Sequence, residues 1–194
     1  MNKSIILAAG IGGALVLYFS LSLYVFPGAY QVGPRKPEAI ITNTSLSASE
    51  IKLGESFIIA VTGTNKGEEA DMQIISVGFP NLTRADNLKI LKHDFAQTPI
   101  FINPGRSVGS QYTGLEISVA AQYEAVEASN RPWSTNRTST IQLEVTPPVE
   151  GKFVIFLKAI AFPHSWDGAH WPQQGIKDRQ KEFVKVYEVS VTNP

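Results

Sequence analysis

The residues best suited to chemistry or recognition gather in one segment, Phe162 to Gln180, with the sequence FPHSWDGAHWPQQGIKDRQ. His164, Asp167 and His170 follow one another at intervals of three residues. Imidazole and carboxylate groups are ligands that zinc, copper and nickel accept. No helical pattern holds both rings on one face, however, and His93 could supply a fourth ligand only if the fold brought it close. The sequence therefore assigns no metal site and no cofactor, with this triplet as the open alternative.

Three aromatic residues of the same segment, Phe162, Trp166 and Trp171, allow two further interpretations. They could fold over the open end of a β-sandwich as a small satellite core, which is what buried aromatic side chains usually do. They could instead form a recognition surface for a protein or glycan. Loops at one end of a sandwich are its usual binding sites, and tryptophan is a common anchor. These residues are the candidate partner-binding residues, with packing as the alternative.

The chain offers little support for catalysis. It has no H-E-x-x-H sequence, no phosphate-binding glycine loop and no dinucleotide fingerprint. Cysteine is absent, which excludes disulfides, Cys-ligated metals and thiol nucleophiles. Acidic residues on polar strand faces, such as Glu116 and Glu124, are expected to be solvated. Glu68, Glu69 and Asp71 share a turn but lack the ligand spacing of a calcium loop. We expect a protein that is not an enzyme.

After the N-terminal apolar run, three N-x-[ST] sequons without an intervening proline mark candidate glycosylation sites at Asn43, Asn81 and Asn136. All three fall at expected strand ends or turns, where a glycan projects into solvent. Their number and the absence of cysteine favour an extracytoplasmic location for the part of the chain that carries them.

The elements that must position these residues begin with an uncharged run from Ser4 to Pro34. Within it, the apolar stretch Ile5 to Phe26 would span about 33 Å as a helix, enough for the hydrocarbon core of a bilayer. This stretch is longer than the apolar part of a typical signal peptide. Residues 1–28 are therefore predicted to be a retained N-terminal transmembrane signal anchor, and a cleaved signal peptide is the alternative.

A short connecting segment, residues 29–38, follows the anchor and contains prolines and charges. It is expected to be an extended stalk. The positive-inside rule does not orient the chain, because Lys3 on one side of the anchor is balanced by Arg35 and Lys36 on the other.

Residues 39–194 change to the alternating pattern of β-strands, with turn residues about every ten positions. No helix is expected after the anchor. The pattern predicts an all-β fold, an immunoglobulin-like antiparallel β-sandwich of seven to eight strands with Greek-key connections. The expected strands lie within 38–46, 54–67, 72–80, 88–95, 115–125, 138–145, 151–162 and 182–191.

The last expected strand carries Lys181 and Lys185 among apolar residues. Lysines on an edge strand discourage pairing with a second molecule, so these two are predicted to protect an edge. The alternative is that this strand, or the extended segment at 38–46, is exchanged between subunits of a filament.

One part of the chain resembles CARDB-type and related immunoglobulin-like modules of membrane-anchored surface proteins of prokaryotes, archaea among them. The modules share a G-[ED]-x-[FV]-x-[IV]-x-[VA] strand followed by N-x-G. A later corner, TPPVEGKF, is also similar, with Phe153 where tyrosine is often found. The resemblance implies an extracytoplasmic location and a binding or scaffolding role. The matching residues are Gly54, Glu55, Phe57, Ile59, Val61, Asn65 and Gly67.

The charge balance narrows the possible partners. The formal net charge is zero and only 18% of residues are charged, which excludes the basic excess expected of a nucleic-acid-binding protein. The leading hypothesis is a single-pass protein of the cell membrane, with its C-terminal domain outside the cytoplasm binding an envelope protein or glycan. The alternatives are an accessory subunit of a membrane enzyme complex, with or without a bound metal, and a surface filament subunit.

Overall fold

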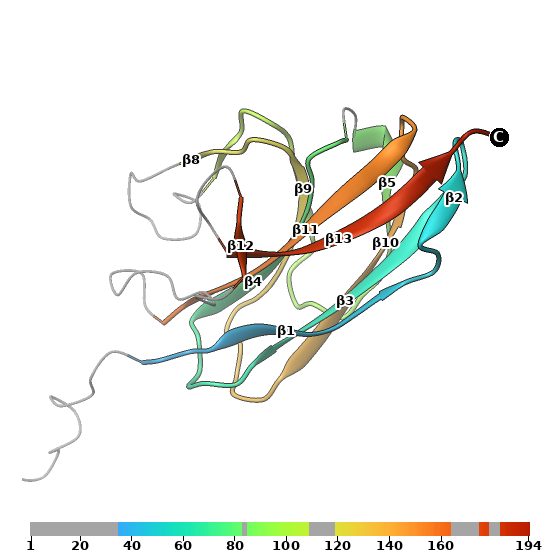
Figure 1. Cartoon of the computed structure of the whole chain (residues 1–194). Coiled ribbons are helices and arrows are strands. Elements are labelled where there is room, and N and C mark those ends of the chain that lie inside the picture. Colours follow the sequence, from blue (N-terminus) through green and yellow to red (C-terminus); the bar gives the residue numbers. More distant parts are fainter. Residues whose placement is uncertain (1–34, 83–84, 109–118, 164–174, 179–182) are drawn as a thin grey trace, which may run out of the picture. The chain divides into compact units, whose positions relative to one another are not determined.

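The computed structural model describes residues 35–82, 85–108, 119–163, 175–178 and 183–194, which belong to one compact unit (Figure 1). This part of the chain is all-β and forms a β-sandwich; its one helical turn is the 3-10 segment η1 (Ala85–Asn87). None of the helices among the described residues is long and apolar enough to cross a membrane. The predicted anchor and the first part of the predicted stalk, residues 1–34, lie outside the described residues.

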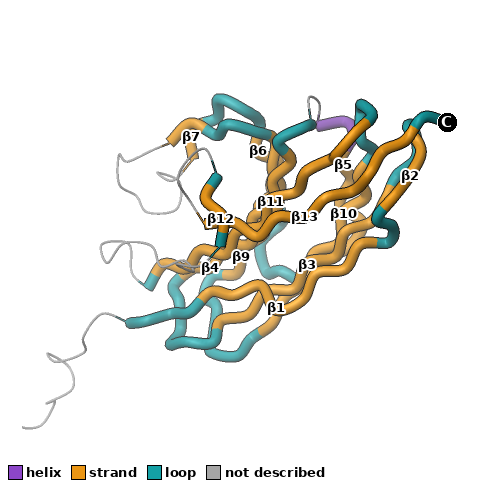
Figure 2. The backbone as a smooth tube through the Cα atoms, viewed as in Figure 1, coloured by secondary structure: helices purple, strands orange, loops and turns teal. Residues whose placement is uncertain are grey.

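The first sheet has four antiparallel strands in the order β1-β3-β10-β5. Strands far apart in the sequence lie side by side in it, since β10 sits between β3 and β5 (Figure 2). The strands are β1 (Ala39–Leu46), β3 (Phe57–Asn65), β10 (Thr138–Val145) and β5 (Leu88–His93).

The second sheet has seven strands, six of them in the order β12-β13-β11-β4-β9-β6, and the short β2 pairs in parallel with β13. A separate hairpin joins β7 to β8. The strands are β2 (Glu50–Lys52), β4 (Met72–Phe79), β6 (Ile100–Ile102), β9 (Glu124–Asn130), β11 (Gly151–Phe162), β12 (Ile176–Lys177) and β13 (Phe183–Thr192). The hairpin strands are β7 (Ser107–Val108) and β8 (Val119–Ala120).

Alternation along the strands explains the core between the two sheets. The residues of β3, β4 and β11 that face the opposite sheet are fully or almost fully buried. Phe153 of β11 packs its ring edge-on against Phe57 of β3, with 5.9 Å between the ring centroids. Each such side chain contributes about 1.5–3 kcal/mol by leaving water. The core residues of these strands are Phe57, Ile59, Val61, Ile75, Val77, Phe79, Phe153, Ile155 and Leu157.

Strand β4 is buried on both faces, because all eight of its residues are buried. Met72, Ile74 and Gly78 point away from the central core, yet they are covered as well. The phenol ring of Tyr123 lies over Gly78, where a Cβ atom would come within 2.3 Å of Cε2 of that ring. The outer face of the second sheet therefore has an apolar layer of its own.

The strand predicted at residues 115–125 is wrong in its position. Strand β8 ends at Ala120, β9 begins only at Glu124, and residues 115–118 lie outside the described part. The break has a clear cause: the backbone N–H of Ala121 donates to Arg106 O at 2.9 Å, and Gly105 N–H donates to Ala121 O at 2.8 Å. These bonds close the β7–β8 hairpin instead of continuing the ladder to β4.

The predicted edge position of the last strand also needs correction. Strand β13 lies between β11 on one side and the short strands β12 and β2 on the other. Lys185 does not project freely, because its Nζ donates to Ile41 O of β1, 2.8 Å away. Lys185 thus links the two sheets, whereas Lys181 lies outside the described residues.

Candidate functional site

We call residues 162–180 the recognition segment, after its predicted role. Only its two flanks are described. Phe162, the last residue of β11, is half-buried, and its carbonyl accepts a hydrogen bond from Asp71 N–H at 2.9 Å. At the other flank, Ile176 is 64% exposed, and Lys177 lies over the ring of Phe183 with 4.8 Å to the ring centroid. The remaining predicted residues of this segment, Trp166, Trp171, His164, Asp167 and His170, lie outside the described residues.

The third tryptophan and the third histidine are both in the described part. Trp133 is fully buried, donates its indole N–H to Arg137 O at 2.7 Å and packs edge-on against Phe95. His93 belongs to β5, opposite Ile141 of β10. In the described ranges, no group of three or more His, Asp or Glu side chains could hold a metal ion.

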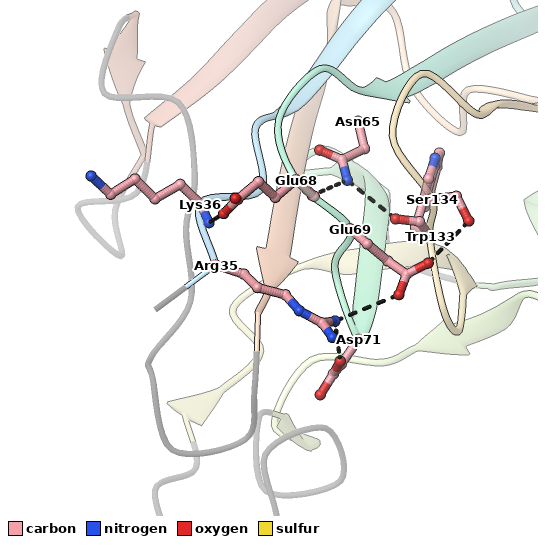
Figure 3. Close-up of polar contacts among 8 residues, drawn as sticks. All are labelled: Arg35, Lys36, Asn65, Glu68, Glu69, Asp71, Trp133 and Ser134. Atoms are coloured by element: carbon pink, nitrogen blue, oxygen red, sulfur yellow. Dashed lines mark hydrogen bonds and ion pairs between the residues drawn. The ribbon is translucent and has the colours of Figure 1, made fainter. Parts of the chain in front are cut away.

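Residues 35–38, predicted as the end of the stalk, are tied to the turn between β3 and β4 (Figure 3). Lys36 N–H donates to Glu68 Oε2 at 2.7 Å, and Glu68 N–H returns a bond to Lys36 O at 3.1 Å. Lys66 N–H donates to Glu38 O at 2.9 Å. Gly67 permits this approach, because a Cβ atom there would lie 2.2 Å from Lys36 O. The chain therefore enters the sandwich as a docked strand-like segment.

The side chain of Asn65 organises this region. It is fully buried, and its Oδ1 accepts bonds from Glu38 N–H at 3.0 Å and Gly67 N–H at 3.1 Å. Its Nδ2 donates to Glu68 O at 2.6 Å and to Trp133 O at 3.1 Å (Figure 3). One side chain thus joins the docked segment, the β3–β4 turn and the loop between β9 and β10.

The acidic residues of the turn pair with arginine. Arg35 Nη1 lies 3.2 Å from Asp71 Oδ1 and 3.5 Å from Glu69 Oε1, and Ser134 Oγ donates to Glu69 at 3.2 Å. These side chains are about one-third to one-half exposed, so each pair is worth at most about 1 kcal/mol. We call the set the tether cluster: Arg35, Lys36, Asn65, Glu68, Glu69, Asp71, Trp133 and Ser134 (Figure 3).

A second polar cluster lies on the outer face of the second sheet and was not singled out from the sequence. Lys158 of β11 places Nζ 2.6 Å from Asp178 Oδ2, which follows β12, with side-chain exposures of 9% and 0%. The Tyr123 hydroxyl donates to the same oxygen at 2.8 Å. The Lys158 ammonium also lies 5.4 Å from the Tyr123 ring centroid, and Phe156 packs edge-on against that ring. We call Tyr123, Lys158 and Asp178 the buried triad.

The chemistry of the buried triad follows from its burial. Removal from water raises the pKa of the Tyr123 phenol above its usual value, although the Lys158 charge acts in the opposite sense. The phenol therefore stays a hydrogen-bond donor across the physiological range. An amine, a carboxyl group and a phenol in direct contact can exchange protons, and the first two can also react with each other.

Glu124 was expected to be solvated, and that prediction is wrong. Glu124 is only 7% exposed, because it pairs with Phe79 of β4 and faces inward from β9. Burial raises the pKa of its carboxyl group. Glu116 lies outside the described residues.

The three sequon asparagines are all exposed. Asn81 lies in the turn after β4 and accepts a bond from Val154 N–H at 3.0 Å. Asn136 lies in a turn with φ of 60°. Asn43 differs from the prediction, because it lies inside β1, at the register shift after Ile41, and not at a strand end.

One motif was missed at the sequence level: Gly105 to Gly109 reads G-x-S-x-G, the spelling of the nucleophile turn of α/β-hydrolases. That turn requires a strand followed directly by a helix. Here Ser107 begins β7 and pairs with Ala120 of β8. The backbone at Ser107 therefore lacks the setting in which the motif activates a serine.

Comparisons with known proteins identify no family. No family model matches the chain, and no curated protein matches it. A β-glucosidase from Listeria innocua in complex with glucose aligns at 15% identity and TM-score 0.39, over 82% of this chain and 16% of its own. A cohesin module from a Clostridium perfringens family 33 glycoside hydrolase aligns at 13% identity and TM-score 0.35, over 82% and 99%. A family 123 glycoside hydrolase from the same species aligns at 9% identity and TM-score 0.40, over 78% of this chain and 27% of its own. Similarity this low carries no conclusion on function.

Proposed function

We propose that this chain is a single-pass membrane protein whose immunoglobulin-like domain has a non-catalytic binding or scaffolding role outside the cytoplasm. One observation carries the proposal. The uncharged run ends at Pro34, and the next residue, Arg35, already belongs to the tether cluster. The eight residues from Pro27 to Pro34 reach at most about 29 Å when fully extended. An anchor at Ile5–Phe26 would therefore keep the tether cluster close to the bilayer.

Two observations support the assignment of an immunoglobulin-like sandwich with Greek-key connections. The order of β1, β3, β10 and β5 requires connections that leave the sheet and return, as in Greek-key sandwiches. The strand of the CARDB-type resemblance is β3, and its Asn65 and Gly67 build the corner that receives residues 35–38. An extracytoplasmic location agrees with the absence of cysteine and with three exposed sequon asparagines.

Membrane attachment is tested by placing charge in the apolar run of the full-length chain. Arginine at the centre of a spanning helix costs about 2.5–3.5 kcal/mol per residue. We expect Leu15→Arg/Leu17→Arg to move the protein from the alkali-washed membrane fraction to the soluble fraction. The matched control, Leu15→Ala/Leu17→Ala, should stay with the membrane. If the arginine variant stays too, this run is not the anchor.

Orientation is tested by single cysteines, which the cysteine-free chain makes unambiguous. Val149 is 56% exposed in the turn between β10 and β11, so Val149→Cys places a thiol on the domain surface. A membrane-impermeant maleimide should label this variant in intact cells, whereas Asn2→Cys should react only after the cells are opened. The reverse pattern would place the domain in the cytoplasm and contradict the proposal.

One observation favours a second candidate, an accessory subunit of a membrane complex. The recognition segment leaves β11 at Phe162, which is hydrogen-bonded to Asp71 of the tether cluster. A segment that starts at the membrane-tethered end of the domain is well placed for a partner that is itself in the membrane. We expect detergent pull-down of the full-length chain to recover an integral-membrane protein and Trp166→Ala/Trp171→Ala to lose it.

The matched control is Phe101→Ala, which removes another aromatic residue that is 37% exposed, on β6. It should retain the partner. Recovery of a glycan or a water-soluble protein instead would favour the envelope-binding function. Metal measured in the same eluate, and lost in His164→Ala/His170→Ala, would overturn the assignment of no cofactor. Self-assembly of the purified chain into fibres would favour the filament alternative.

A further inference from the structure

We propose that Lys158 and Asp178 form an intramolecular amide bond, which cross-links β11 to the segment after β12. The cross-link is independent of the binding role proposed above and uses only groups of the buried triad. It would form without an added cofactor, oxidant or second protein.

The first argument is geometric. Lys158 Nζ lies 2.6 Å from Asp178 Oδ2. The carboxyl carbon is one bond beyond that oxygen, so the nitrogen lies near the separation of about 3–3.5 Å at which reacting atoms meet. Lys158 pairs with Ser76 of β4, and the preceding residue, Leu157, also pairs with β13, so the backbone is held in place here.

The second argument is burial. The Lys158 side chain is 9% exposed and the Asp178 side chain 0%. Desolvation disfavours the charged forms of both groups, and a buried ion pair gives little net stability. Transfer of one proton from the ammonium to the carboxylate produces a neutral amine beside a neutral carboxylic acid. These are the protonation states in which an amine attacks a carboxyl carbon.

The step balances without any other reactant. The Nζ–Cγ bond forms and gives a tetrahedral intermediate. The bond from Cγ to one carboxyl oxygen then breaks, and that oxygen leaves as water with the proton that it carries and one proton from the amine. An ammonium and a carboxylate thus become one amide and one water molecule, with no change of oxidation state. Exclusion of bulk water favours the products.

Tyr123 is positioned to assist this step. Its hydroxyl donates to Asp178 Oδ2 at 2.8 Å, so it can stabilise negative charge that develops on this oxygen during attack. Phe156 and Gly78 hold the ring from two sides, by an edge-on contact and by close approach of the backbone. Tyr123 is therefore placed as a donor in this reaction, whereas Lys158 and Asp178 are the reactants.

The bond would close a loop between residues 158 and 178, which contains most of the recognition segment. A covalent closure removes conformational freedom from the unfolded chain and fixes both ends of the loop in the folded one. In a chain without cysteine, no disulfide can do this. The amide would also resist reducing agents.

The test is the intact mass of the folded, purified full-length protein, measured under denaturing conditions. We expect it to lie one water molecule below the mass of the sequence. Trypsin should then fail to cut after Lys158 and leave residues 153–177 linked to the dipeptide Asp178-Arg179. Lys158→Met and Asp178→Ala should show their full calculated masses. Tyr123→Phe should form the bond about 100-fold more slowly.

The chain contains its own control for accidental dehydration. Lys152 lies on the same face of β11 and pairs with Glu188 at 2.9 Å, but these side chains are 75% and 48% exposed. This pair should remain unlinked. Full calculated mass for the folded wild-type protein would overturn the proposal. So would water loss that maps to any other place, such as a succinimide at Asp167-Gly168.

Discussion

Replacing Asn65 by alanine tests whether this one buried side chain holds the segments of the tether cluster together. Asn65 is fully buried and takes part in four side-chain hydrogen bonds, to Glu38, Gly67, Glu68 and Trp133. A typical bond of this kind contributes about 0.5–1.5 kcal/mol net. Three of the four are only partly buried, so water can replace some of them. We expect Asn65→Ala to lower the free energy of unfolding by about 3 kcal/mol.

That loss is a large share of the roughly 5–15 kcal/mol by which a domain is stable. For a domain of this size it corresponds to a fall in the melting temperature of about 6–12 °C. Urea denaturation followed by circular dichroism gives the free energy directly, and hydrogen exchange should show faster exchange at the amides of Glu38 and Gly67. The exposed Asn43→Ala is the matched control and should stay within about 0.5 kcal/mol of wild type.

Asn65→Asp sharpens the test because it keeps the shape and the acceptor oxygen but removes both donors. The new carboxylate would face the carbonyls of Glu68 and Trp133. Its pKa in the folded state should rise, so its destabilisation should grow as the pH rises through the usual aspartate range and shrink below it. A loss of less than about 1 kcal/mol for Asn65→Ala would refute the reasoning.

Three other variants probe the second sheet. Gly78→Ala places a Cβ atom 2.3 Å from the Tyr123 ring, so it should cost about 1–3 kcal/mol in thermal unfolding, and less in a Tyr123→Leu background. The pKa of Tyr123 is raised in the folded state. The stability that this shift contributes is therefore complete below the usual tyrosine pKa and is lost as the pH rises above that usual pKa. Wild type should therefore lose stability in alkali faster than Tyr123→Phe. Lys185→Met removes the bond to Ile41 O and should cost about 1 kcal/mol in thermal unfolding, whereas Lys152→Met, at an exposed ion pair, should cost less than that.

Most of the long strands could be predicted because their alternation is set by burial on one face. The bounds predicted at 138–145 and 151–162 are those of β10 and β11. The prediction at 115–125 failed because alternation does not show where the backbone leaves the ladder. Glu124 was misplaced for a related reason: the polar residue in an alternating run was taken to face solvent, but β9 turns this one inward.

The buried triad could not be predicted from spacing. Tyr123 and Asp178 are 55 positions apart, and they meet only because β12 pairs with β13 and the chain after it reaches Tyr123. Two signals were nevertheless present in the sequence. Residues 72–79 contain no charge, which is typical of a strand covered on both faces, and Lys158 interrupts an apolar outer row on β11. The tether cluster was missed because residues 35–38 have the composition of a linker.

The placement of the two ends of the sandwich determines how it would carry a mechanical load. The segment at Arg35 is docked at one end, and Figure 1 shows the C-terminus at the other. A pull between these points acts along the strands, so the many hydrogen bonds of β1 with β3 and of β13 with β11 would share it in shear. A pull between Arg35 and a partner held beyond Phe162 would enter and leave at the same end. In that case the bonds of residues 35–38 to the β3–β4 turn and the pairing of β11 with β4 near Phe162 would bear the force first.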